Sequence, residues 1–168
     1  YTTTATEYNN WFHWEISGPQ ALNNTLTLLY PALTGAEITN NLNAIDRFSP
    51  GGAGAKYGWM TGANTSDKAL VVAVRGILGR NADKLASARD NLSPVFRYVT
   101  GGDGFYRDGS FVFHSKIAYN GHYGLVLLGD IPQLVNLLQG STWQITDSNL
   151  TNVFNWVRDL FAPLMYHG

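Results

Sequence analysis

The stretch TGAEITNNLNAIDRF (residues 34–48) decides the fold class. Thr34 is followed three residues later by Glu37, the spacing of a capping box, in which each side chain binds the other residue's backbone amide at a helix start. Apolar residues then recur at steps of three and four, as on one stripe of a helix: Ile38, Leu42, Ile45 and Phe48. The stretch therefore predicts an amphipathic helix over residues 34–48, which ends before Ser49 and Pro50.

The same helical spacing recurs along the rest of the chain. It predicts five further helices: residues 11–30, from Asn64 or Thr65 to Gly79, 82–91, 123–138 and 148–164. The first is expected to be interrupted or to begin near Gly18 and Pro19, and Pro132 to kink the fifth or displace its start. Alternation of apolar and polar residues is nowhere sustained, and residues 51–62 and 100–104 are glycine-rich loops or turns. We therefore expect an all-α domain.

One architecture that combines paired helices with functional loops is a toroid of helical hairpins around a central cleft, and we expect this architecture here. The 168 residues supply fewer hairpins than a closed toroid needs, so we expect a piece of a larger domain. Hydrophobic residues make up 45% of the chain, enough for a real core.

Composition limits the classes of function. With 11 basic and 12 acidic residues, the chain offers no positive surface for a phosphate backbone, so we expect no nucleic-acid partner. The strongly apolar run at residues 69–74 is far shorter than the roughly 20 residues that span a bilayer, so we expect no membrane partner. The chain has no cysteine, which excludes disulfides and thiol chemistry.

Aromatic residues make up 13% of the chain and accompany many Asn, Thr, Ser and Gly residues. This mixture is typical of carbohydrate-binding surfaces, where rings stack on sugars and amides bind their hydroxyls, and equally of an aromatic core. Adjacent residues on a helix point in different directions, so at least one of Trp11 and Phe12 is a candidate for sugar stacking. Asn10 precedes them, and Trp59 adds a ring in the glycine-rich loop.

The stretch DGSFVFHSKIAYNGHYG (residues 108–124) contains two histidines and two tyrosines. Tyr123 follows His114 by nine residues and lies near Gly121 and Gly124, so a turn can bring the phenol back towards the imidazole. A phenol has an ordinary pKa of about 10, and a neighbouring imidazole lowers the cost of ionising it. Such a pair can remove and return a proton, while a buried structural role for His114 is the alternative.

Asn64, in TGANTSD (residues 61–67), lies where a glycine-rich loop meets a helix start. Its side chain can cap the helix. Alternatively, its amide can bind a substrate carboxylate and stabilise the charge that develops when the neighbouring carbon loses a proton.

Other chemistry has weaker support. His114 and His122 lie eight residues apart and no HExxH pattern occurs, so we expect no metal and no other cofactor. An acid pair of the glycosidase type has four candidates, none of which the spacing selects: Glu7, Glu15, Asp103 and Asp108.

Four segments, in this order, resemble the helical catalytic domain of the family 8 polysaccharide lyases, which include hyaluronate, chondroitin AC and xanthan lyases. They are NNWFHWEISGPQALNNTLTLL (9–29), TGANTSD (61–67), GDGFYRDGSFVFHSKIAYNGHYG (102–124) and FAPLMYHG (161–168). The stretch at residues 72–100 looks most like actinobacterial hyaluronate lyases. The resemblance implies an incomplete α/α toroid whose cleft binds an acidic polysaccharide and cleaves it by β-elimination.

The resemblance also implies roles for single residues. Asn64 would neutralise the uronate carboxylate and acidify the C5 proton. His114 and Tyr123 would form the proton-transfer centre, with Tyr123 as the donor to the leaving oxygen and either residue as the base. Tyr119 and His122 do not align with catalytic positions.

Substrate-positioning residues are implied in the same way. Asn10, Trp11 and Phe12 match the family's aromatic patch, and Trp59 falls near its third member. Phe113 departs from the family pattern, in which Gln or Asp usually precedes the histidine, so we expect a different orientation of the imidazole.

Family members continue past the PLMYHG region into an arginine-bearing R-G-R segment and large β-sandwich domains. We therefore expect residues 1–168 to be a fragment of the toroid catalytic domain without these parts, completed by the rest of its own polypeptide. The expected function is that of a secreted, extracellular bacterial carbon-oxygen lyase acting on hyaluronan. A chondroitin AC or xanthan lyase, an inactive carbohydrate-binding fragment and an inverting glycoside hydrolase are the alternatives.

Overall fold

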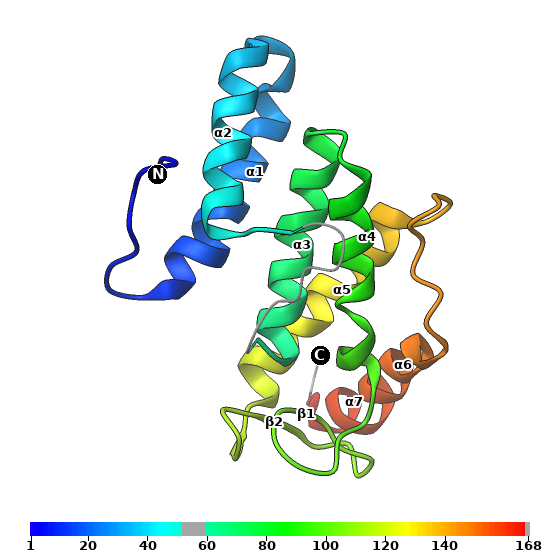
Figure 1. Cartoon of the computed structure of the whole chain (residues 1–168). Coiled ribbons are helices and arrows are strands. Elements are labelled where there is room, and N and C mark those ends of the chain that lie inside the picture. The colour runs from blue at the N-terminus through cyan, green and yellow to red at the C-terminus, as the bar shows by residue number, and fades with distance from the viewer. Residues whose placement is uncertain (52–59, 167–168) are drawn as a thin grey trace. The chain divides into compact units, whose positions relative to one another are not determined.

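The structure, a computed structural model, describes residues 1–51 and 60–166. The chain divides into two compact units. The first unit is Tyr1–Tyr57 with Lys68–Asp90, and the second unit is Gly58–Asp67 with Asn91–Gly168. The described part is mainly helical (Figure 1), so the predicted all-α class is confirmed.

The helices of the first unit follow the apolar spacing of the sequence. They are α1 (Gly18–Leu29), α2 (Gly35–Phe48), the part of α3 (Gly62–Leu78) from Lys68 onward, and α4 (Ala82–Asp90). A π-helical turn at His13–Ser17 leads directly into α1, which begins at Gly18 as predicted. Pro19 lies at this junction, where its fixed φ of about −65° matches a helix.

The capping box at the start of α2 is confirmed. The Thr34 amide donates to Glu37 Oε2 at 2.8 Å, and the Glu37 amide donates to Thr34 Oγ1 at 3.2 Å. Helices α1 and α2 lie side by side (Figure 1). Their apolar stripes and that of α3 form a core cluster of Leu26, Leu42, Ile45, Val71 and Leu78.

Charged residues of the first unit are buried only with partners. Arg75 and Lys84 are 8% and 6% exposed, and both bind Asp46. Arg75 makes two hydrogen bonds to the Asp46 carboxylate, of 2.8 and 2.7 Å, and Lys84 Nζ lies 2.8 Å from Asp46 Oδ1. One carboxylate therefore neutralises two buried cations, from α3 and α4.

The second unit contains a small sheet that the sequence did not predict. Its strands are β1 (Gly104–Phe105), β2 (Phe111–Phe113) and β3 (Ile117–Ala118), antiparallel in the order β1-β2-β3. Phe105 pairs with Phe111, and the Phe105 ring stacks on Trp156 with centroids 4.0 Å apart. Strands of two or three residues are too short to show a period of two, which is why the segment looked like turns.

Helices of the second unit are less regular than predicted. A π-helical turn at Asn120–Gly124 leads into α5 (Leu125–Leu138), and Pro132 lies inside α5 without displacing its start. The predicted helix 148–164 is divided into a 3₁₀ turn at Ser148–Thr151, α6 (Asn152–Trp156), a π-helical turn at Val157–Phe161 and α7 (Ala162–Leu164).

A buried hydrogen bond joins the first turn of α3 to α5 within the second unit. Ser66 Oγ donates to Asp130 Oδ2 at 2.7 Å, and Ser66 is 0% and Asp130 6% exposed. Burial, together with the negative charge of nearby Asp67, raises the pKa of Asp130 from 3.8 to about 7, although the Ser66 hydrogen bond opposes this. The folded chain therefore keeps a proton on Asp130 that an exposed aspartate would release.

Replacing Asp46 should strongly destabilise the first unit. Asp46→Ala leaves the cations of Arg75 and Lys84 buried without their carboxylate, and we expect a loss of about 3–5 kcal/mol in the free energy of unfolding. Asp90→Ala is the matched control, because Asp90 pairs with Arg89 at a side-chain exposure of 59%. The control should change the free energy by less than about 1 kcal/mol in the same denaturant titration. Equal losses in the two variants would contradict the assignment.

Asp130 should make stability fall as the pH rises. Its folded pKa lies above its unfolded value, so its contribution is fully present below pH 3.8 and is lost as the pH rises through about 7. Asp130→Asn cannot ionise and should lack this part of the pH dependence. Denaturant titrations of both proteins across this window provide the measurement, and parallel curves would exclude Asp130 as the cause.

Candidate functional site

The second unit brings His114 and Tyr123 together. Their ring centroids lie 5.4 Å apart with the planes at 85°, so the edge of one ring faces the other. His114 is exposed and Tyr123 half-buried. An imidazole and a phenol at this separation can both reach a small group placed beside them, which is the geometry that proton transfer requires.

Two turns produce this contact. His114 follows β2, and β3 returns the chain antiparallel to β2, with Phe113 paired to Ile117. The π-helical turn Asn120–Gly124 then carries Tyr123 back towards the hairpin. The nine-residue spacing is therefore bridged by a hairpin and a helical turn.

Tyr119 and His122 lie in the same ring cluster. The Tyr119 ring is 6.0 Å from His114 and 4.8 Å from Tyr123, and the His122 ring is 5.0 Å from Tyr123. All three contacts have an edge-on geometry. Tyr119 thus packs against both members of the pair, which gives it a structural role in the cluster.

The buried ring of Phe113 packs against both His114 and Tyr123 and forms an apolar surface, called here the apolar floor of the site. Phe113 is 1% exposed, and its ring centroid lies 4.3 Å from that of Tyr123 and 4.9 Å from that of His114. A Cβ at Gly62 would approach the Phe113 ring to 3.0 Å, so α3 begins directly against this floor. The phenyl ring cannot accept the hydrogen bond that a Gln or Asp at this position could offer the imidazole.

Asn64 lies within the first turn of α3 and is not its N-cap, which corrects the prediction that Asn64 or Thr65 caps this helix. The helix begins at Gly62 because the Thr65 amide already bonds to the Thr61 carbonyl, at 3.4 Å. Gly62 has a φ of 48°, which glycine adopts without strain at the turn into the helix.

The Asn64 side chain is buried, at 5% exposed. Within residues 1–51 and 60–166, it makes no hydrogen bond to another side chain or to the backbone. An amide nitrogen donates and an amide oxygen accepts, so this side chain is suited to bind a carboxylate or a hydroxyl of a ligand.

The predicted aromatic patch lies in the first unit. Asn10 Oδ1 accepts a hydrogen bond from the Phe12 amide at 3.0 Å, and the Trp11 and Phe12 rings meet edge to face with centroids 6.0 Å apart. Both rings are half-buried, so both keep some exposed surface. Trp59 lies outside the described residues.

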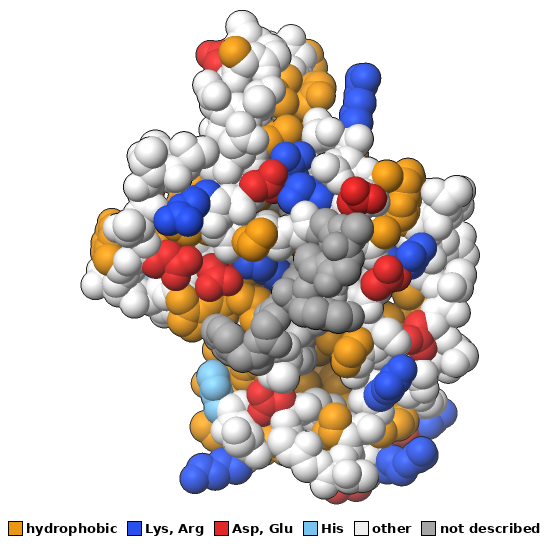
Figure 2. Space-filling view, in the orientation of Figure 1, with side chains coloured by type: hydrophobic (Ala, Val, Ile, Leu, Met, Phe, Trp, Pro, Cys, Tyr) orange, Lys and Arg blue, Asp and Glu red, His pale blue; other side chains and the backbone are white. Residues whose placement is uncertain are grey.

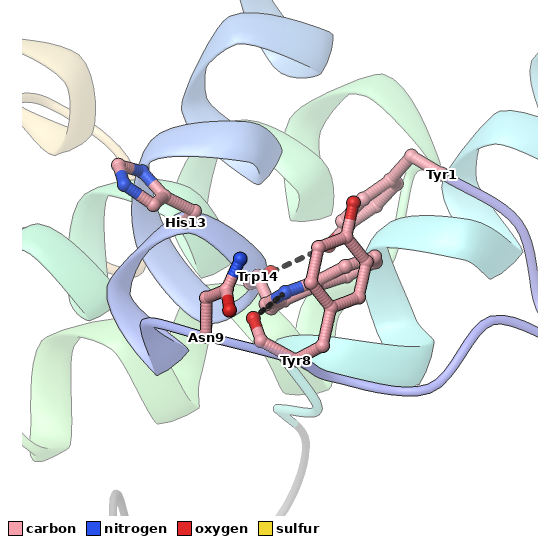
Figure 3. Close-up of a pocket in the computed structure, with 5 residues that line it drawn as sticks. All are labelled: Tyr1, Tyr8, Asn9, His13 and Trp14. Carbon is pink, nitrogen blue, oxygen red and sulfur yellow. Dashed lines mark hydrogen bonds between the residues drawn. The ribbon is translucent and has the colours of Figure 1, made fainter.

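An aromatic pocket of about 210 Å³ lies beside this patch and is lined by Tyr1, Tyr8, Asn9, His13 and Trp14 (Figure 3). The Tyr1 hydroxyl donates to the Trp14 carbonyl at 2.8 Å, and Trp14 Nε1 donates to the Tyr8 carbonyl at 2.9 Å. The sequence grouped Trp14 with Asn10, Trp11 and Phe12 but did not indicate that the other four lining residues join it. The number of aromatic residues between Tyr1 and Trp14 is the feature of the sequence that could have indicated this pocket.

Basic and acidic side chains are interspersed on the face drawn in Figure 2. No group of three or more His, Cys, Asp or Glu in the described part of the chain could hold a metal ion. No described helix is long and apolar enough to cross a membrane.

Comparisons with known proteins agree with this structure. The family "Polysaccharide lyase family 8, N terminal alpha-helical domain" matches residues 1–168. A xanthan lyase of Bacillus sp. (strain GL1) is 44% identical over 95% of this chain and 17% of its own length, and a hyaluronate lyase of Thermasporomyces composti is 45% identical over 96% and 20%.

A solved structure of the Streptomyces coelicolor A3 chondroitin AC lyase in complex with chondroitin sulphate is also similar. It superposes with a TM-score of 0.93 at 44% identity, and the match covers 99% of this chain and 22% of that one. The chain thus spans about a fifth of the length of these relatives. With its whole length matched, the chain belongs to polysaccharide lyase family 8, in the N-terminal α-helical domain.

Proposed function

We propose that the polypeptide carrying this chain is a polysaccharide lyase that cleaves a uronate-containing glycan by β-elimination. One observation carries the proposal: His114 and Tyr123 lie with ring centroids 5.4 Å apart, in the motif that resembles the family's proton-transfer centre. The relatives named hyaluronate, xanthan and chondroitin AC lyase support the same reaction class.

In the proposed reaction, one of the two rings removes the C5 proton of the uronate as the base. The electron pair left on C5 forms the C4=C5 double bond, and the glycosidic C4–O bond breaks. Tyr123 donates a proton to the leaving oxygen. The Asn64 amide donates to the uronate carboxylate, onto which charge spreads as C5 loses its proton, so its effect is greatest in the transition state.

The proposed substrate is hyaluronan, with chondroitin and xanthan as alternatives. A relative named hyaluronate lyase is 45% identical, but one named xanthan lyase is 44% identical, so identity alone favours neither. Because the relatives are about five times as long, we propose that the rest of the polypeptide completes the cleft. We propose a secreted, extracellular bacterial protein, since an intact polysaccharide is too large to enter a cell freely.

A carbohydrate-binding role without chemistry is the second candidate. The half-buried rings of Trp11 and Phe12 and the aromatic pocket support it, because exposed aromatic faces stack on sugars. Binding of hyaluronan without turnover by the full-length polypeptide would favour this role.

The lyase proposal predicts a new ultraviolet absorbance. The full-length polypeptide, incubated with hyaluronan, chondroitin sulfates and xanthan, should release a product whose C4=C5 bond is conjugated with the uronate carboxylate. A glycoside hydrolase would instead give new reducing ends without this absorbance. If none of the three polymers yields an unsaturated product, the lyase proposal is wrong.

Tyr123→Phe should greatly lower turnover but leave binding intact. Loss of the proton-transferring hydroxyl should lower kcat by about 10²–10⁴-fold, while the ring contacts with Phe113 and His114 remain. Tyr119→Phe is the matched control, because it removes a hydroxyl from the adjacent ring of the same cluster. Steady-state rates and hyaluronan affinity measure the two effects. Similar losses of kcat in both variants would count against Tyr123 as the proton donor.

Asn64→Asp should lower kcat/KM by about 10²–10³-fold, because the new carboxylate repels the uronate and offers it no amide donor. Asn24→Asp makes the same change at an exposed position of α1 and should leave kcat/KM unchanged. An Asn64→Asp enzyme as active as the Asn24→Asp enzyme would remove Asn64 from the site.

A further inference from the structure

Asp103 connects two segments that the proposed chemistry needs. It lies between the glycine-rich turn at residues 100–102 and β1. Its Oδ2 accepts a hydrogen bond from the Thr61 hydroxyl at 2.7 Å, and its Oδ1 accepts one from the Ser115 amide at 2.6 Å. Thr61 precedes Asn64 by three residues, and Ser115 directly follows His114.

The Ser115 contact holds a strained turn. His114 has a φ of 52° and Ser115 a φ of 68°, two successive non-glycine residues in the left-handed region. Such conformations are unfavourable and persist only where the surrounding structure enforces them. An amide that donates to a carboxylate makes a charge-assisted hydrogen bond, about twice as strong as a neutral one. Asp103 therefore stabilises the backbone conformation that presents the His114 ring.

The Thr61 contact holds the start of α3. Thr61 provides the carbonyl that accepts from the Thr65 amide, and Gly62 follows with its positive φ. A shift of Thr61 would therefore move the first helical turn, which carries Asn64. The approach of Gly62 to the Phe113 ring limits that movement on the side of the ring.

The backbone around Asp103 is itself fixed. Gly102 and Gly104 on either side have φ values of 75° and 137°, and a Cβ on Gly104 would lie 2.9 Å from Val99 Cγ1. The Tyr106 hydroxyl donates to the Gly102 carbonyl at 2.9 Å. The glycines let the chain turn sharply enough for one carboxylate to reach both partners.

We propose that Asp103 is a positioning residue, which sets the placement of Asn64 relative to the His114–Tyr123 pair by binding Thr61 and Ser115 at once. This inference rests on the proposed lyase function and extends it. Both oxygens of Asp103 accept hydrogen bonds from the protein, as this positioning role requires.

The test compares three variants of the full-length polypeptide. Asp103→Ala removes both contacts, whereas Asp103→Asn can keep both as neutral hydrogen bonds, because an amide oxygen accepts from Ser115 and an amide nitrogen donates to Thr61. Asp108→Ala is the control: it removes a carboxylate of the same region that accepts from the Ser110 amide and hydroxyl and that lies outside the proposed link.

With hyaluronan, or whichever polymer the wild type cleaves, Asp103→Ala should lower kcat by about 10²-fold, because small misplacements of reacting groups are that costly. KM should change much less. Asp103→Asn should recover most of kcat, and Asp108→Ala should match the wild type.

Amide hydrogen exchange of Ser115 gives a readout that does not depend on activity. Exchange should be faster in Asp103→Ala than in the wild type, Asp103→Asn or Asp108→Ala. Should Asp103→Ala fail to fold, Thr61→Val removes one contact alone and should lower kcat while leaving Ser115 protected.

Three results would overturn the proposal. The first is a kcat of Asp103→Ala equal to that of Asp108→Ala, and the second is an unchanged rate of Ser115 amide exchange in Asp103→Ala. The third is a kcat of Asp103→Asn as low as that of Asp103→Ala, although the Ser115 amide of Asp103→Asn is still protected. The last result would mean that the charge of Asp103 takes part in the chemistry. An inactive wild type would instead refute the proposed function, and Ser115 exchange would still decide whether Asp103 holds the turn.

Discussion

Helix α3 buries five polar residues in succession, from Asn64 to Lys68, and the rest of the structure depends on how they are satisfied. A buried polar group without a hydrogen bond is costly, and a buried charge without a partner more so. Ser66 binds Asp130, and Lys68 donates to both Glu15 and the Phe48 carbonyl at 3.0 Å. Burial lowers the pKa of Lys68, while Glu15 favours its charged form. Asn64 lies two residues from the first of these anchors and has no partner among the residues described. Its position is thus fixed by neighbours, while its own amide makes no hydrogen bond within residues 1–51 and 60–166.

The helices of this chain could be predicted because their signals are local. Thr34 and Glu37 form the capping box that their spacing indicates, and the apolar stripe of α2 packs into the core. The small sheet could not be predicted in this way. Its strands are two or three residues long, and they form because the Phe105, Phe111 and Trp156 rings pack together. That packing joins residues far apart in the sequence, so no local period reveals it.

In the candidate site, too, the features with a local signal could be predicted, and those that depend on distant residues could not. The spacing of His114 and Tyr123 with nearby glycines indicated a turn between them, and their rings are adjacent. The left-handed conformation of His114 and Ser115 has no such signal, because it is imposed by the hairpin and by a carboxylate from another loop. Spacing did not distinguish Asp103 from three other acidic residues. Its partners, Thr61 and Ser115, lie 42 and 12 residues away in the sequence, so no local pattern indicates its role.

Phe113 contacts several parts of the candidate site through an apolar ring. Its ring contacts Tyr123 and His114 and limits how closely Gly62 can approach. A Gln or Asp here could orient the imidazole by a hydrogen bond, and a buried Phe cannot. The orientation of His114 then depends on its ring contacts and on its backbone, which the Ser115 amide and the hairpin register hold. In the proposed lyase, an apolar floor also keeps water from one side of the phenol, which strengthens the electrostatic interactions on the other. In the proposed lyase, Phe113 thus offers the imidazole no hydrogen bond, and the left-handed turn beside it is held by the Asp103 carboxylate through the Ser115 amide.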